Sequence, residues 1–137
     1  MNKRILVLLI LMSLFFALVG CNTNTTTSNK TAKIEIMSNY WETIAESDQP
    51  SHETTFYYDV KEGDVIEVPI MYPIKITIVR ITADTIEIKT DVELDVMDGT
   101  DYLGSNFSVK MGETLGLITS ASDFGAWYKI SIQSISD

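Results

Sequence analysis

From Ile34 onward, apolar and polar side chains alternate with a period of two over most of the chain. The clearest run lies between residues 86 and 96, where one parity is apolar: Ile86, Ile88, Val92, Leu94 and Val96. Such alternation is typical of strands with one buried and one exposed face. The pattern predicts strands over 55–60, 66–72, 76–82, 86–96, 107–111, 115–119 and 128–132.

Three interruptions mark where these strands are expected to bend or end. The alternation slips between Ile78 and Val79, which indicates a strand that is bulged or buried on both faces. The run at 86–96 exceeds the about five to six residues of a typical strand, so we expect a bend or break near Thr90 and Asp91. Pro69 lacks the backbone N–H that a sheet ladder needs, so its strand is expected at an edge or at a bulge.

A helix is suggested only by residues 39–47, with Asn39 as a possible N-cap and Glu42 three residues later. It would have at most two turns. Elsewhere, short strands separated by turn signals favour two packed antiparallel sheets. We therefore expect an all-β protein whose residues 33–137 form a single antiparallel β-sandwich, either immunoglobulin-like or jelly-roll-like, since the pattern does not distinguish the two.

The N-terminus has a different pattern from the rest of the chain. Lys3 and Arg4 precede an apolar run over 5–19, which is shorter than the about 20 residues that a membrane-spanning helix needs. This arrangement is typical of a secretory signal peptide, with a retained anchor helix as the alternative. Residues 22–32 are rich in Asn and Thr and contain no large apolar side chain, so they are expected to form a flexible tether.

The sequence Leu18-Val19-Gly20-Cys21 resembles the lipobox of bacterial lipoprotein precursors. The resemblance covers residues 1–21 only. It implies that residues 1–20 are removed as a signal peptide and that Cys21 receives the lipid, so that residues 21–32 form the lipidated start and the tether. It also implies attachment to the extracytoplasmic face of the cell membrane, or to an outer membrane if the host is Gram-negative. Residues 33–137 resemble the small β-sandwich modules of surface lipoproteins from low-GC Gram-positive bacteria, with no named family matched.

Charge and composition exclude several classes of function. The 137 residues include 10 basic and 19 acidic ones, for a net charge of −9. Loss of Lys3 and Arg4 with the leader leaves 8 basic residues and a net charge of −11. Such a chain repels phosphate backbones, so no nucleic-acid partner is expected. One cysteine and one histidine rule out a disulfide framework and a Cys/His zinc site, and no cofactor is expected.

Candidate catalytic groups are few. His52 lies in one polar segment with Ser51 and Asp48, but immediate neighbours in a loop rarely converge as a nucleophile and its base. The many carboxylates make glycoside hydrolysis conceivable without pointing to any one pair. We therefore expect no enzyme, and an envelope hydrolase remains only a second alternative.

Five acidic residues between positions 91 and 101 raise the question of calcium, which takes about six to eight oxygen ligands: Asp91, Glu93, Asp95, Asp98 and Asp101. The EF-hand template requires glycine where this segment has Val96. We favour another explanation for the first three acids, namely an outward, solvated strand face that keeps sheets from pairing edge to edge. No metal site is expected, and if calcium did bind, Asp95, Asp98 and Asp101 are the best ligands.

Aromatic residues occur in three adjacent pairs at 40–41, 57–58 and 127–128. Neighbours in a strand point to opposite faces, so each pair should place one ring inward and one outward. With Tyr58 and Tyr128 assigned to the core, Tyr57 and Trp127 are the predicted outward, ligand-binding rings.

We therefore expect a lipid-anchored, non-catalytic envelope module that binds a protein, a peptide or a cell-wall glycan. The alternative is an accessory or immunity-type lipoprotein that modulates a membrane complex.

Overall fold

A computed structural model describes residues 29–42, 52–100, 102–120 and 124–137. Its eight strands are β1 (Thr31–Glu42), β2 (Thr54–Lys61), β3 (Val65–Val68), β4 (Ile74–Ile81), β5 (Thr85–Val96), β6 (Leu103–Lys110), β7 (Thr114–Ile118) and β8 (Phe124–Ser136). None of the described residues is helical. The predicted all-β class is confirmed.

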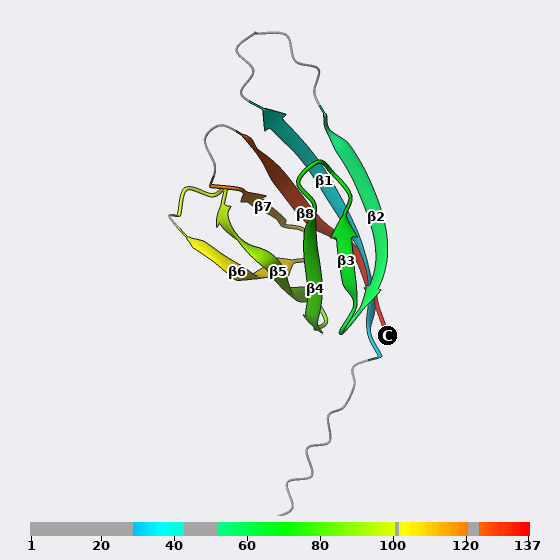
Figure 1. Ribbon diagram of the computed structural model, residues 1–137. Helices are drawn as coiled ribbons and strands as arrows, with labels where there is room; N and C mark the ends of the chain where they lie inside the picture. Colours follow the sequence, from blue (N-terminus) through cyan, green and yellow to red (C-terminus); the bar gives the residue numbers. More distant parts are fainter. Residues whose placement is uncertain (1–28, 43–51, 101, 121–123) are drawn as a thin grey trace, which may run out of the picture.

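All eight strands belong to one antiparallel sheet that curls into a nearly closed, barrel-like shape (Figure 1). The order along the sheet is β2-β1-β8-β7-β5-β4-β3, and β6 pairs with β5 outside this path. The long strand β5 makes the sheet continuous, because its first half pairs with β4 and its last residues pair with β7. The sequence left the strand order open. Most strands that pair in the sheet are also consecutive in the chain, and pairing of β1 with β8 joins the first strand to the last.

The alternating apolar side chains fill the interior of this curled sheet. Inward residues of β1 and β8, including Ile34, Ile36 and Tyr128, pack against those of β4 and β5, including Ile76 and Ile88. Burial of each large aliphatic side chain contributes about 1.5–3 kcal/mol. The side chains predicted to face inward in these strands are therefore the ones that form the core.

Two local predictions for β4 and β5 hold. The register between these strands shifts between Ile78 and Arg80, which places a bulge at Val79. The register of β5 with β6 shifts between Lys89 and Leu94, where the strand bends from one part of the sheet to the other. Pro69 follows directly after β3, which is the last strand of the path and pairs with β4 alone.

Val92 does not follow the inward pattern, since it is 44 % exposed although its parity is inward. The cause is the bend in β5. Thr90 is buried there, and its hydroxyl donates to the carbonyl of Val92 at 2.7 Å. A hydrogen bond from the Thr90 side chain to the backbone is therefore found where the sequence pattern suggested an apolar contact.

The first strand corrects two predictions. Residues 39–42 are extended rather than helical, because this end of β1 pairs with the first residues of β8. Residues 43–47 of the predicted helix lie outside the described residues. The strand also begins at Thr31, two residues before the predicted domain start, and Ala32 is buried in the core. Ser38 obscured the pattern because it is a buried polar residue at an inward position.

Because consecutive strands run in opposite directions, the connections gather at two ends of the molecule. One end, which we call the proximal end, contains residues 29–30, 62–64, 82–84, 111–113 and Asp137. The distal end contains residues 52–53, 69–73, 97–100 and 119–120. Figure 1 shows the C-terminus and the start of β1 together at the proximal end. There Lys30 forms an ion pair with Asp137.

Candidate functional site

Four rings lie in a row at the distal end and form the strongest candidate site. The His52 and Tyr40 rings are stacked, with centroids 4.2 Å apart and planes within 11°. Tyr40 meets Tyr72 edge-on at 6.5 Å, and Tyr72 stacks on Phe124 at 5.3 Å. These separations are those of favourable aromatic pairs. We call this set the ring row.

The ring row is held in place from the core. Tyr128 is fully buried in β8, and its hydroxyl donates to the backbone carbonyl of Tyr72 at 2.7 Å. Burial, with a smaller effect from the negative charge of Asp91, raises the pKa of Tyr128. The hydroxyl therefore stays protonated as a donor, and it fixes the 69–73 loop on which Tyr72 lies.

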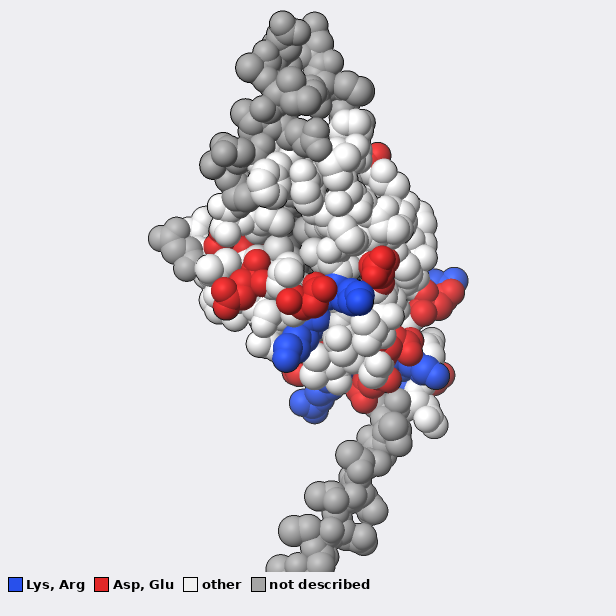
Figure 2. Space-filling view, in the orientation of Figure 1, with Lys and Arg blue, Asp and Glu red and all other residues white. Residues whose placement is uncertain are grey.

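The ring row opens to solvent through Phe124, which is 52 % exposed. Met71, in the loop that contains Tyr72, is exposed to a similar extent. Residues 52, 69–73, 119–120 and 124–128 include no Lys, Arg, Asp or Glu. On the face drawn in Figure 2, most charged side chains of the described residues lie over the lower, proximal part. Charged residues do lie nearby, since Glu42 is opposite Phe124 in the ladder of β1 and β8 and Glu53 follows His52. The partly exposed rings make this end a candidate for recognition.

A close backbone approach supports the start of β8. Gly125 is opposite Trp41 in the ladder of β1 and β8. A Cβ atom at position 125 would overlap both the Trp41 indole and the Thr119 hydroxyl oxygen. Thr119 in turn accepts from the backbone N–H of Ala126 at 3.0 Å. Glycine at position 125 therefore leaves the room against the backbone of β8 that the Trp41 indole occupies.

The two rings predicted to bind ligand lie on the outward face of the sheet, as expected, but apart from each other. Tyr57 is 71 % exposed on β2. A hydrogen bond with Glu35 and the charge of that carboxylate raise the pKa of Tyr57. Trp127 is half-buried on β8, and the Lys129 ammonium lies 5.1 Å from its ring centroid. Since β1 separates their strands and their register positions differ, they do not form one site.

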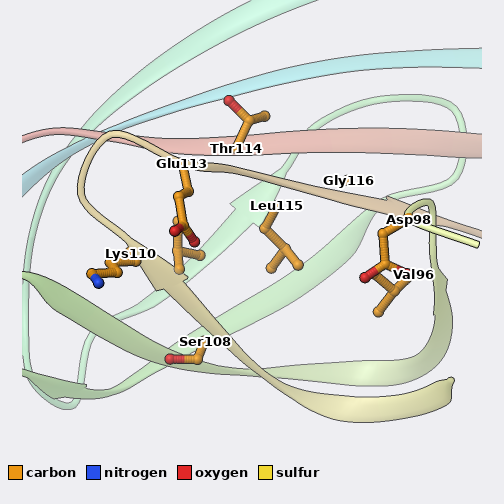
Figure 3. Close-up of a pocket in the computed structure, with 9 residues that line it drawn as sticks. Val96, Asp98, Ser108, Lys110, Glu113, Thr114, Leu115 and Gly116 are labelled. Carbon is orange, nitrogen blue, oxygen red and sulfur yellow. The ribbon is translucent and has the colours of Figure 1, made fainter. Parts of the chain in front are cut away.

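A hollow lies between β6 and β7, where the two strands diverge after the turn that joins them (Figure 3). Its volume is about 240 Å³, and Val109 and Leu115 contribute to its lining. Figure 3 shows Leu115 directed into the opening, with Glu113 and Asp98 on opposite sides of it. The volume is below the roughly 300–1,000 Å³ of ordinary ligand pockets.

Of the candidate catalytic and metal-binding residues, His52 and Asp98 have partners in the structure. His52 stacks on Tyr40, while Ser51 and Asp48 lie outside the described residues. The Asp98 carboxylate accepts from the hydroxyl and the backbone N–H of Thr100. Both hydrogen bonds lower the pKa of Asp98, and the one from the Thr100 hydroxyl has the larger effect.

One carboxylate of the acidic strand has a hydrogen-bond partner on the neighbouring strand. Asp91 accepts from the backbone N–H of Lys75 at 2.9 Å, where β4 and β5 separate. Within the described ranges, no three His, Cys, Asp or Glu side chains are grouped as metal ligands, and Asp101 is outside them.

Cys21 and the predicted leader lie outside the described residues. In the part of the chain that is described, no helix is long and apolar enough to cross a membrane. Comparison with protein-family models, curated proteins and solved structures found no match.

The sequence analysis missed Tyr72 and Phe124. Tyr72 lies between Pro69 and Pro73, and its position as the end of an alternating run suggested a core strand instead. The pairing of β1 with β8 and the loop geometry bring together rings that are more than 80 positions apart in the chain, as Tyr40 and Phe124 are. The only local signal was the presence of aromatic residues at strand ends.

Proposed function

We propose that this protein is a lipid-anchored, non-catalytic module of a bacterial cell envelope that binds its partner through the distal end. The lipid is attached at Cys21, and the domain is held at the extracytoplasmic face of the membrane. The partner is a protein, a peptide or a cell-wall glycan. No nucleic acid is involved, in keeping with the net charge of −9.

The observation that carries this proposal is the ring row, which is exposed at Phe124, opposite the point where the chain enters the domain. The described chain begins at Asn29 beside Asp137, at the proximal end. A tether attached there leaves the distal end unobstructed. Exposed aromatic side chains held by buried supports are favourable anchors for binding, because little side-chain entropy is lost.

Anchoring is tested with Cys21→Ser in cells fed a labelled fatty acid. We expect the wild-type chain to carry the label and to fractionate with membranes, and the variant to carry none and to remain unprocessed. Gly20→Ala, which keeps a small residue before the cysteine, serves as the matched control. A labelled Cys21→Ser chain would contradict lipid attachment at this residue.

Binding is tested by placing a photo-crosslinking residue at Phe124 and, in a separate variant, at Val65. Val65 is a comparably exposed apolar residue, at 60 %, but it lies at the proximal end. We expect a saturable crosslink to an envelope component from position 124 and none from position 65. Equal crosslinking at the two positions would contradict a distal binding surface.

A further inference from the structure

We infer that the free edge of β6 binds an extended peptide segment of a partner protein, which joins the sheet as an additional strand. This site shares no residue with the ring row and does not depend on the proposed function. It is carried by the backbone groups of β6 and β7 that face the hollow between them, and by the apolar side chains around that hollow.

Every second residue of β6 directs its backbone groups away from β5. The backbone N–H of Met111 donates to the carbonyl of Asp84 at 2.7 Å, in line with the ladder of β5 and β6. Because the direction of these groups alternates along a strand, those of Ser108 and Lys110 face the other side. There the Lys110 carbonyl accepts from the N–H of Glu113 at 3.0 Å and closes the turn into β7. Neither the N–H nor the carbonyl of Ser108 has a hydrogen-bond partner among the described residues.

The facing strand has the same arrangement on its own wall of the hollow. One side of β7 pairs with β8, and on the other side the Gly116 carbonyl accepts from the N–H of Met97 at 2.9 Å. Thr114 is two residues earlier, so its backbone groups point to that same side, away from β8. Thr114 and Ser108 both line the hollow. Main-chain donors and acceptors are therefore available on both of its walls.

These main-chain groups select a polypeptide as the ligand. Along a strand edge they repeat every two residues, or about 7 Å, and an added strand matches the repeat with its own N–H and carbonyl groups. The hydroxyl groups of a glycan do not follow this alternation of donor and acceptor, and an acyl chain provides no donor. The class of ligand thus follows from the backbone of β6 before any side chain is considered.

The side chains around the edge indicate what the peptide should carry. Val109 and Leu115 contribute to the lining of the hollow, and Leu115 points into its opening (Figure 3). Near the two ends of β6, Tyr102, Leu103 and Met111 are 47 %, 49 % and 40 % exposed. A peptide with apolar residues at alternate positions presents them on one face, where they can cover these groups.

The charges near the edge are mixed. Asp98, Lys110 and Glu113 line the hollow, and Glu87 and Lys89 lie on β5 in the part that pairs with β6. Three carboxylates and two ammonium groups nearly balance. The peptide is therefore recognised by its backbone and its apolar side chains rather than by its charge.

The other two strands at sheet edges, β2 and β3, are better protected against pairing. β2 carries Asp59 and Lys61. β3 has only four residues, and its Glu67 carbonyl already accepts from the Tyr58 hydroxyl at 3.1 Å. Proteins use short strands, charges and prolines to prevent unwanted pairing at an edge. Residues 103–109 of β6 contain neither a charge nor a proline, so this is the edge most suited to an added strand.

The test uses heptapeptides that are selected from a random-sequence phage library on the immobilised full chain in detergent and are then synthesised. We expect the selected sequences to have apolar residues at alternate positions. N-methylation of alternate peptide amides in one register should weaken binding about tenfold or more, because it removes the ladder donors. The same modification in the other register should have a smaller effect.

Ser108→Pro tests the protein side of the ladder. Proline is tolerated where the N–H faces away from the neighbouring strand, so the pairing of β6 with β5 should persist. We expect this variant to bind the peptides about tenfold more weakly or worse. Phe124→Ala, which alters the ring row alone, is the matched control and should bind them as the wild type does.

Amide hydrogen exchange followed by NMR gives a second measurement that needs no variant. In the free chain the Ser108 amide should exchange rapidly, whereas the Val109 amide, which faces β5, should be protected. Added peptide should slow exchange at Ser108 about tenfold or more and leave Val109 unchanged.

Four outcomes would overturn the inference. The first is that no peptide is enriched, and the second is that binding is lost in Phe124→Ala but kept in Ser108→Pro. The third is that the Ser108 amide is already protected in the free monomer, because its edge is then covered. The fourth is a dimer in sedimentation velocity that Ser108→Pro abolishes, which would make a second copy of the chain the occupant. The crosslink from position 124 is independent of all four, so the proposed function can stand or fail separately.

Discussion

The two ends of the sheet are built in different ways from the same strands. At the proximal end, tight turns join the strands, and Gly63 and Gly112 adopt positive φ angles of 86° and 84° there. Charged side chains of the turns also form hydrogen bonds with the backbone at this end. The Glu62 carboxylate, for example, accepts from the backbone N–H of Ile81 at 2.8 Å. At the distal end, stacked rings lie along the 69–73 loop and the start of β8, and only the 97–100 turn, with Gly99 at a φ of 83°, resembles the proximal turns.

This difference separates two tasks. Turn hydrogen bonds and positive-φ glycines fix the strand register, so the proximal end stabilises the fold. The rings of the distal end expose apolar surface that folding alone would bury. Tyr128 links the two, since it belongs to the core and supports the 69–73 loop.

Substitution of Tyr128 should give the largest effect. Tyr128→Ala leaves a cavity beneath the ring row and should lower the free energy of unfolding by about 3–5 kcal/mol. Tyr128→Phe keeps the ring but leaves the carbonyl of Tyr72 without this donor, at a cost of about 1–3 kcal/mol. Denaturant unfolding measures both. If Tyr128→Phe is neutral, the hydroxyl does not fix the distal loop.

Glycine substitutions separate the two ends by mechanism. Gly125→Ala overlaps Trp41 and Thr119 and should cost about 1–3 kcal/mol through overpacking. Gly63→Ala has no atom within 4 Å of its Cβ, so its cost of about 1–2 kcal/mol comes from the backbone angle alone.

Asparagine at the same two positions is the control. Gly63→Asn should recover part of the loss, because asparagine tolerates positive φ, whereas Gly125→Asn should be worse than alanine. Thermal unfolding of the four variants decides the matter. Equal behaviour of asparagine at both sites would remove the distinction between close packing at one end and backbone conformation at the other.

High pH should weaken the distal support selectively. Burial raises the pKa of Tyr128 above that of an unfolded tyrosine, so the folded state favours the neutral hydroxyl. Its contribution is complete below the unfolded value of about 10 and is lost as pH rises toward the folded value. The melting temperature should therefore fall above about pH 10, and less steeply in Tyr128→Phe. Identical slopes in the two proteins would show that another group is responsible.

The smallest effect is expected from divalent ions. The Asp98 carboxylate is engaged by Thr100, and the lowered pKa of Asp98 means that this contribution is lost only as pH falls below the usual aspartate range. Calcium and magnesium at matched ionic strength should change the melting temperature equally, by screening. A rise with calcium alone that disappears in Asp98→Asn would establish a calcium site instead.

Sequence patterns predicted what depends on neighbours in the chain. The slip at Val79, the bend after Thr90 and the outward position of Tyr57 all follow from strand parity. The end of β1 was mistaken for a helix because Asn39 and Glu42 satisfy a local capping pattern, whereas long-range pairing with β8 decides the outcome.

The ring row escaped prediction for the same reason. Its members come from β1, from the segment before β2, from the loop after β3 and from the start of β8. Only the strand order brings them together, and parity contains no information about that order. Gly125 likewise has no local signal, because its role depends on the Trp41 ring across the ladder.

The position of β1 between β2 and β8 has a mechanical consequence. The strand is paired with β2 from Thr31 to Ser38 and with β8 as far as Glu42. Any pull on Lys30 enters this strand along its axis, perpendicular to the hydrogen bonds of both ladders. The bonds are thus loaded together in shear rather than opened one at a time. A domain under tension between its N-terminal attachment and a ligand at the opposite end would resist extension, because the force acts on its most extensively paired strand.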